Sequence, residues 1–212
     1  MTIAQKPNWK KAALAAVLGG LSGFAAMFAF MHWGWGDELE ALGGERIAVA
    51  AIGMVYLLTG VFVGVGLLAP TFGAKVLNVE DAEELIDMRS HLARSSIAIL
   101  LIGALLFLLS ASGPGGYFGD TLVLAATALV VVIASVLSWQ TGRAYDELWR
   151  QLSNECAAAA LALLLPTVLV WGVLAHLGWL PFTPLGVIAL LAALVLVGAY
   201  IAAGRRGMLT PR

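Results

Sequence analysis

Charged side chains are scarce in this sequence. Asp, Glu, Lys and Arg together make up 12% of the 212 residues, whereas hydrophobic residues make up 61%. In a soluble domain, about a quarter of the residues are charged and about 45–50% are apolar. We therefore expect most of the surface of this chain to face lipid, and the composition predicts an integral membrane protein.

An excess of positive charge is also missing. The formal net charge is -1, and the basic residues lie between apolar runs instead of along one face. Nucleic-acid binding needs a basic patch that neutralises phosphates. We expect no nucleic-acid partner. The expected partners are the lipid bilayer and either another membrane protein or further copies of this chain.

Cysteine and histidine are too few for the common metal sites. A single cysteine, Cys156, excludes an internal disulfide and a cysteine-based metal cluster. Three histidines are too scattered for the usual zinc spacings. His32 and His176 both fall at the outer ends of apolar runs, so haem ligation by these two histidines is a minor alternative. The main expectation is a chain without a cofactor or metal.

Sequence signatures of common catalytic sites are absent as well. The chain contains no G-x-S-x-G, no H-E-x-x-H, no Walker loop and no G-x-G-x-x-G that opens a helix after a strand. The Gly-Pro-Gly-Gly segment at 113–116 has no lysine to meet a phosphate. We expect no enzyme activity.

Long apolar runs are what the sequence does contain. A membrane-spanning helix needs about 20 mostly apolar residues. Six runs qualify, at residues 12–31, 47–69, 95–112, 121–139, 156–177 and 185–204. The first run is longer than a signal-peptide core of about 7–15 residues and lacks a clear cleavage site, so we interpret it as a retained span. The fold class is therefore predicted as all-α, a polytopic membrane helix bundle forming one domain over 1–212.

The basic residues predict the orientation of this bundle. Cytoplasmic connections carry the excess of Lys and Arg. With six spans, only Arg46 falls on the opposite side. All of the following fall on one side: Lys6, Lys10, Lys11, Lys75, Arg89, Arg94, Arg143, Arg150, Arg205, Arg206 and Arg212. Both termini are expected in the cytoplasm.

A polar rim is predicted at the cytoplasmic side. The segment 78–94 has apolar residues at helical spacing and Asn78 as its N-cap, so we expect an amphipathic helix that continues into the third span. Residues spaced by three or four share one helix face before the third and fifth spans. The members of this polar rim are Glu84, Asp87, His91, Arg94, Glu147, Arg150, Asn154 and Glu155. The rim is either a docking surface or a set of helix-end charges that pair with one another.

Glycines at four-residue spacing mark the first two spans. Gly19 and Gly23 lie in the first span, and Gly60 and Gly64 lie in the second. Such small-xxx-small pairs let helix backbones approach closely, so we expect these two spans to pack together. The alternative is that the glycines line a permeation path. No span carries Asp, Glu, Lys or Arg near its middle, which argues against a proton relay or an ion path.

A weak internal similarity relates two segments 63 residues apart. The segment 84–91 resembles 147–154, and each precedes an odd-numbered span. Spans two and three would then repeat as spans four and five in the same orientation, as in parallel-repeat transporters. The alternative is that acidic, amphipathic entries to membrane helices resemble one another in general.

The last third of the chain carries a resemblance to known proteins. The segment 145–157 reads Tyr-Asp-Glu-Leu-Trp-Arg-Gln-Leu-Ser-Asn-Glu-Cys-Ala, and two spans and Gly-Arg-Arg-Gly at 204–207 follow it. This part resembles a group of small, uncharacterised bacterial inner-membrane proteins, in which an Asp-Glu-x-x-Arg helix with a later Glu-Ala precedes two spans. Here Cys156 follows Glu155 and Trp149 takes a usually polar position. The resemblance implies a bacterial inner-membrane location and no particular activity.

Two functional classes fit these observations. Apolar, glycine-containing spans without buried charge favour a non-catalytic accessory or structural component of a membrane complex. The internal similarity and the glycines of the first two spans favour a small carrier or channel for a neutral or lipophilic solute.

Overall fold

The computed structural model describes residues 43–71, 73 and 82–206, together with Gly23, Ala25, Phe28, Ala29 and His32. These residues are helical apart from short connections and an isolated bridge between Ser112 and Phe118. Among them are five helices that are long and apolar enough to cross a membrane. The architecture is therefore all-helical, as a membrane helix bundle requires. The predicted first span at 12–31 lies almost entirely outside the described residues.

The described helices follow the predicted apolar runs closely. Their bounds are α3 at Gly44–Leu68, α5 at Ala82–Asp87, α6 at Arg89–Ser110, α7 at Asp120–Ala144, α8 at Glu147–His176 and α9 at Pro184–Arg205. α6 and α8 each begin with polar turns before their apolar stretches. A helix can extend through polar residues, because each added residue gains a backbone hydrogen bond. These polar turns hold much of the predicted rim.

The predicted entry helix at 78–94 is divided in two. α5 ends at Asp87, Met88 forms a turn, and α6 begins at Arg89. The carbonyl oxygen of Met88 accepts hydrogen bonds from the N–H groups of both His91 and Leu92. Leu85 of α5 is 1% exposed and packs beside Gly73. Asn78, the expected N-cap, lies outside the described residues.

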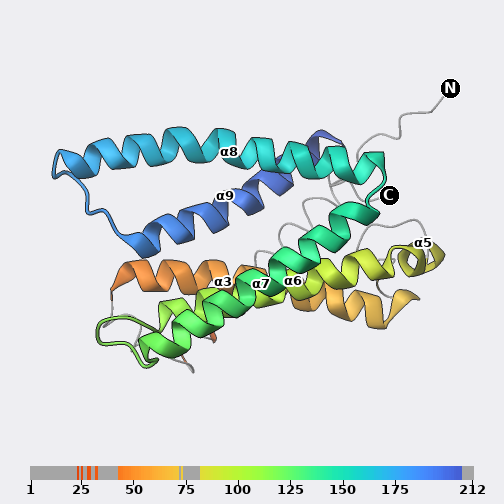
Figure 1. Cartoon of the computed structure of the whole chain (residues 1–212), viewed down its shortest axis with the longest axis horizontal. Coiled ribbons are helices and arrows are strands. Elements are labelled where there is room, and N and C mark those ends of the chain that lie inside the picture. The colour runs from red at the N-terminus through yellow and green to blue at the C-terminus, as the bar shows by residue number, and fades with distance from the viewer. Residues whose placement is uncertain are drawn as a thin grey trace.

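The helices form two antiparallel pairs that meet along α3 and α9 (Figure 1). α3 packs against α6, and α8 packs against α9. The core between the pairs is built from Val49, Tyr56, Leu106 and Ala189. α7 packs on the α6 side of the bundle. The two pairs are therefore joined mainly through α9, which leaves α7 and α8 at the periphery.

Glycines bring the paired helices into backbone contact. A Cβ atom at Gly60 would lie 2.6 Å from Leu100 of α6, so Gly60 packs against α6. A Cβ atom at Gly103 would lie 2.9 Å from the backbone nitrogen of Leu57, and one at Gly198 would lie 2.8 Å from the carbonyl oxygen of Cys156. These contacts hold α3 to α6 and α9 to α8.

The other predicted packing glycines show less contact. A Cβ atom at Gly64 would lie 3.4 Å from the Ser96 hydroxyl oxygen, an ordinary contact with α6. One at Gly23 would meet open space, and Gly19 lies outside the described residues. The expected packing of the first span against the second is therefore a prediction that these residues do not test.

α7 and α8 diverge from their short connection. Only Tyr145 and Asp146 separate the two helices in the chain, yet the helices point apart and make at most marginal contact (Figure 1). In the proposed repeat, α7 and α8 correspond to α3 and α6, which pack closely along their length. The two halves therefore pack differently, and the packing gives the internal repeat no support.

Basic residues collect at one end of the bundle, which we call the basic end. The end of α7, the start of α8 and the end of α9 meet there with α5 and the start of α6 (Figure 1). The described arginines at this end are Arg89, Arg94, Arg143, Arg150, Arg205 and Arg206. The opposite end holds Arg46, which is 6% exposed and donates a 3.0 Å hydrogen bond to the carbonyl oxygen of Pro114. Lys6, Lys10, Lys11, Lys75 and Arg212 lie outside the described residues.

Candidate functional site

The corner between α7 and α8 builds the candidate site. Asp146 is the N-cap of α8, and its side chain accepts a 2.9 Å hydrogen bond from the backbone N–H of Trp149. An N-cap carboxylate satisfies a backbone donor that has no partner within the helix, and it suits the positive end of the helix dipole. This cap starts α8 directly after the corner and sets the direction in which it leaves α7.

A row of aromatic rings ties the corner to α6. The His91 ring stacks on Tyr145 with centroids 5.8 Å apart, and Tyr145 stacks on Trp149 at 6.4 Å. Burial raises the pKa of the Tyr145 hydroxyl, and the nearby Cys156 raises it further. Tyr145 therefore stays protonated at neutral pH and can donate a hydrogen bond.

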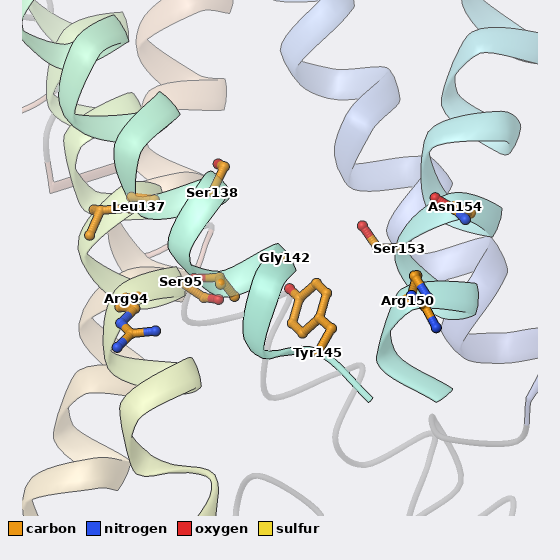
Figure 2. A pocket seen from close by; sticks show the side chains of 11 residues that line it. Arg94, Ser95, Leu137, Ser138, Gly142, Tyr145, Arg150, Ser153 and Asn154 are labelled. Carbon is orange, nitrogen blue, oxygen red and sulfur yellow. The ribbon is translucent and has the colours of Figure 1, made fainter. Parts of the chain in front are cut away.

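A cavity of about 280 Å³ opens between α6, the end of α7 and the start of α8. Figure 2 shows the Tyr145 ring between Ser95 on one side and Arg150 on the other, with Ser153 pointing from α8 into the space. The described residues that line it are Arg94, Ser95, Ala98, Leu137, Ser138, Thr141, Gly142, Tyr145, Arg150, Ser153 and Asn154. We call this cavity the corner pocket.

The structure brings part of the predicted polar rim together in the corner pocket. Arg94 from α6 lines one wall, and Arg150 and Asn154 from α8 line the opposite one, so both predicted segments contribute (Figure 2). The other members of the rim do not line it: Glu84, Asp87, His91, Glu147 and Glu155. His91 contributes indirectly, through its stacking on Tyr145.

The two arginines of the corner pocket differ in their partners. Arg150 pairs with Glu147 one turn earlier, and both side chains are exposed. Arg94 is half-buried and forms no ion pair or hydrogen bond within the part of the chain that the structure describes. Among the described residues, therefore, no carboxylate compensates the charge of Arg94, whereas Glu147 compensates that of Arg150.

The serine and threonine hydroxyls of the pocket also form no hydrogen bonds with the part of the chain that the structure describes. Several hydroxyls elsewhere in the apolar helices bond to the carbonyl one turn earlier, as Thr59, Thr127 and Thr167 do at 2.7 Å. Those that line the pocket have no such bond within the described residues: Ser95, Ser138, Thr141 and Ser153. Thr141 is only 6% exposed. The pocket thus offers hydroxyl groups that can serve a ligand.

Glu155 pairs with Arg206, a residue that the sequence analysis did not include in the rim. The Arg206 guanidinium contacts both carboxylate oxygens of Glu155, at 2.7 and 3.1 Å. The hydrogen bond with Glu155 raises the pKa of Arg206, which keeps it charged. This two-point contact fastens the end of α9 to the start of α8.

The histidines of the haem alternative are both exposed. His32 stacks on Phe28 with ring centroids 5.5 Å apart, and His176 is the last residue of α8. Among the described residues, no group of three or more His, Cys, Asp or Glu side chains could hold a metal ion. Haem ligation stays untested.

Most of the polar residues in the pocket were not predicted from the sequence. Ser138, Thr141, Gly142 and Tyr145 are spaced by three, one and three, so they lie on one face of α7 and its end. This spacing could have indicated a polar face at the end of the fourth span. Ser95 and Ser153 gain their significance only from the approach of α6 and α8 to that face.

Comparisons of the chain with protein-family models, curated proteins and solved structures found no match. The resemblance of residues 145–157 to bacterial inner-membrane proteins therefore stays a prediction.

Proposed function

We propose that this chain is a non-catalytic component of a larger membrane assembly. In this proposal, the bundle lies in a bacterial inner membrane with its basic end and both termini in the cytoplasm. The observation that carries the proposal is the exposure of α7. The most apolar 18-residue window of α7 contains no residue that is buried inside the chain, whereas 28% of the corresponding window of α3 is buried.

The chemistry of the exposed face favours a protein partner. Lipid alone can cover large apolar side chains, and α7 carries several, such as Leu124 and Val132. The same helix also exposes Ala125, Ala128 and Ser135, which share a face with Val132. Helix contacts in membranes are enriched in small residues, because small side chains allow close approach of two backbones. A helix from another protein therefore fits this face.

The polar rim gives the proposal of a docking surface less support than its sequence pattern indicated. Glu147 pairs with Arg150, and Glu155 pairs with Arg206, so these charges have partners within the chain. Exposed pairs of this kind contribute little to binding unless they are desolvated. We therefore place the partner contact on α7, and we expect changes at Glu147 and Glu155 to leave the assembly intact.

The mass and composition of the native particle test the proposal. The chain is solubilised gently from its own membrane, separated on a native gel and identified by mass spectrometry. We expect the particle to contain a second polypeptide. Ala128→Trp on α7 should remove this polypeptide, whereas the control Ala199→Trp, on the exposed face of α9, should retain it. A particle that contains only this chain contradicts the proposal, as does equal retention of the partner by both variants.

A carrier for a neutral or lipophilic solute is the alternative, and the corner pocket is the observation in its favour. The pocket lies at one end of the bundle, however, and glycine contacts close the interface between α3 and α6. Gly60→Leu is a poor test of transport, because a Cβ atom there already meets Leu100 at 2.6 Å and the variant would disturb packing. Gly142→Leu and Gly172→Leu are better variants, since neither glycine has a neighbour within 4 Å of its added Cβ. Flux into liposomes that is lost with Gly142→Leu but kept with Gly172→Leu would favour the carrier.

A further inference from the structure

We propose that the corner pocket binds a phosphate group at the basic end of the bundle, and that a phospholipid head group supplies it. The proposal combines the uncompensated Arg94, the unbonded hydroxyls and the cavity that they share. It does not depend on the partner proposed for α7.

Arg94 supplies the charge that a phosphate needs. A half-buried guanidinium loses hydration, and this loss is costly unless an anion or several acceptors replace the water. No acceptor in the described part of the chain does so. The planar guanidinium matches the oxygens of a phosphate and can donate two parallel hydrogen bonds to them. A phosphate in the corner pocket would therefore supply the missing partner of Arg94.

Arg150 and Asn154 extend the cationic and polar lining from the opposite wall. The pair between Arg150 and Glu147 is exposed, with 60% and 65% of the side chains accessible, so water screens it strongly. Arg150 can accordingly contact a phosphate without giving up a strong interaction. The carboxylates at the start of α8 do not line the pocket: Asp146 caps the helix, Glu147 pairs with Arg150, and Glu155 pairs with Arg206.

The hydroxyl groups provide the remaining donors. Ser95, Ser138 and Thr141 come from α6 and α7, and Ser153 comes from α8, so the donors surround the cavity. Each hydroxyl can donate one hydrogen bond to a phosphate oxygen. Within the described residues, Thr141 is buried and has no hydrogen-bond partner, whereas Thr127 of the same helix bonds to the carbonyl oxygen of Val123. This contrast indicates that the pocket leaves donors free for a ligand.

The size and depth of the pocket favour a lipid as the source of the phosphate. Its volume of about 280 Å³ lies just below the roughly 300–1,000 Å³ of small-molecule sites, which suits a head group and not a whole lipid. The pocket lies where the predicted apolar runs end at 139 and begin at 95 and 156, and head groups occupy that level. Beyond it, α7 and α8 diverge and expose Leu129 and Leu161, which acyl chains can cover. Basic pockets between membrane helices bind anionic head groups in this way.

An arginine at this level can also help to set the orientation of the chain in the membrane, because Lys and Arg near helix ends reach toward the cytoplasmic interface. That role needs neither a cavity nor unbonded hydroxyls around the arginine. Arg143 provides the comparison: it lies at the same end, does not line the pocket, and stacks its guanidinium 4.6 Å from the Trp139 ring centre. Removal of either arginine changes the net charge of the basic end equally.

Lipid binding to the full chain in detergent tests the proposal by native mass spectrometry. The probes are phosphatidylglycerol, diacylglycerol with the same acyl chains but no phosphate, and water-soluble glycerol phosphate. We expect one tightly bound phosphatidylglycerol and little diacylglycerol. Arg94→Gln should weaken binding about tenfold, whereas Arg143→Gln should leave it unchanged. Arg94→Lys should fall between them, because lysine keeps the charge but loses the planar fork.

A second variant tests the cavity independently of charge. Gly142→Leu fills the pocket from a position where an added Cβ has no neighbour within 4 Å, so the helix packing is kept. We expect it to abolish the binding that Gly172→Leu, equally unhindered on α8, retains. This variant keeps the test informative if Arg94→Gln fails to fold.

The outcomes separate the source of the phosphate from the site itself. Binding of phosphatidylglycerol without glycerol phosphate identifies a lipid. Binding of glycerol phosphate that shows the same dependence on Arg94 and Gly142 identifies a soluble phosphate and overturns the lipid assignment. Equal binding of phosphatidylglycerol and diacylglycerol overturns the phosphate site, and so does an equal loss with Arg94→Gln and Arg143→Gln.

Discussion

The hydroxyl group of Tyr56 in α3 donates a 2.9 Å hydrogen bond to the carbonyl oxygen of Ala192 in α9. Tyr56 is 4% exposed and belongs to the core between the two helix pairs. The hydrogen bond therefore joins the α3–α6 pair to the α8–α9 pair at a buried position.

Removal of this hydroxyl should weaken the contact between the two pairs. Hydrogen bonds between membrane helices contribute about 0.6 kcal/mol on average and at most about 1.7 kcal/mol. We expect Tyr56→Phe to lower the free energy of unfolding by an amount in this range, measured by denaturant titration in detergent micelles. Tyr200→Phe is the control, since Tyr200 is exposed on α9. An equal loss in both variants would show that the Tyr56 hydrogen bond is not responsible.

Glycine substitutions should have opposite effects at two positions. In Gly103→Ala, the new Cβ atom would lie 2.9 Å from the backbone nitrogen of Leu57, so α3 and α6 must separate. We expect a loss of about 1–3 kcal/mol in the free energy of unfolding, the usual cost of overpacking. Gly172→Ala meets open space in α8 and should gain up to about 1 kcal/mol from helix propensity. A stabilised Gly103→Ala protein would contradict the packing of α3 on α6.

Arg46 should protect the turn at the end opposite the basic end. Its guanidinium donates to the carbonyl oxygen of Pro114, and Gly113 and Gly115 in this turn have positive φ angles. We expect Arg46→Ala to loosen the turn, because the carbonyl loses its partner and the turn loses its anchor on α3. Limited proteolysis should then cut within 112–118 faster than in the unmodified protein. Arg205→Ala, at the basic end, is the control. If it increases cleavage within 112–118 as much as Arg46→Ala does, the protection does not come from Arg46.

Thiol labelling should place the two ends of the bundle on opposite sides of the membrane. After Cys156→Ala, single cysteines are introduced as Gly119→Cys or Trp179→Cys at one end and Asp87→Cys or Arg205→Cys at the basic end. A thiol reagent that cannot cross the membrane should label only the first pair in intact cells. All four positions are exposed, so access does not limit the reaction. Labelling of the second pair alone would reverse the predicted orientation.

The sequence predicted the helices well because each depends on local chemistry. The apolar runs from 47 onward correspond to α3, α6, α7, α8 and α9 within a few residues at their apolar ends. Asp146 starts α8, and Thr183 with Pro184 starts α9, through caps that short segments specify. The break at Met88 was not predicted, and neither was the burial of Leu85 of α5 beside Gly73, a contact that no local pattern specifies.

The candidate site was predicted only in part. Arg94, Arg150 and Asn154 were identified from their spacing on two separate helices, and the corner pocket includes all three. The acidic members of the rim were grouped with them, although none of them lines the pocket; Glu147 pairs with Arg150, and Glu155 pairs with Arg206. The hydroxyls of α7 were missed, because serine and threonine in an apolar helix usually bond to their own backbone and signal nothing.

Composition and hydrophobic patterning were enough to identify a helical chain with membrane-length apolar runs, because the number of apolar residues needed to cross a bilayer is a property of each segment alone. The positions of the predicted spans also placed most basic residues at one end of the bundle. Which helices pack against one another was decided only by the tertiary structure. Gly60 packs against α6, α9 joins the two pairs through Tyr56, and α7 turns away from α8. All these spans are similarly apolar, so only the shapes of opposing surfaces, with glycines where backbones touch, decide which helices meet and where a pocket remains.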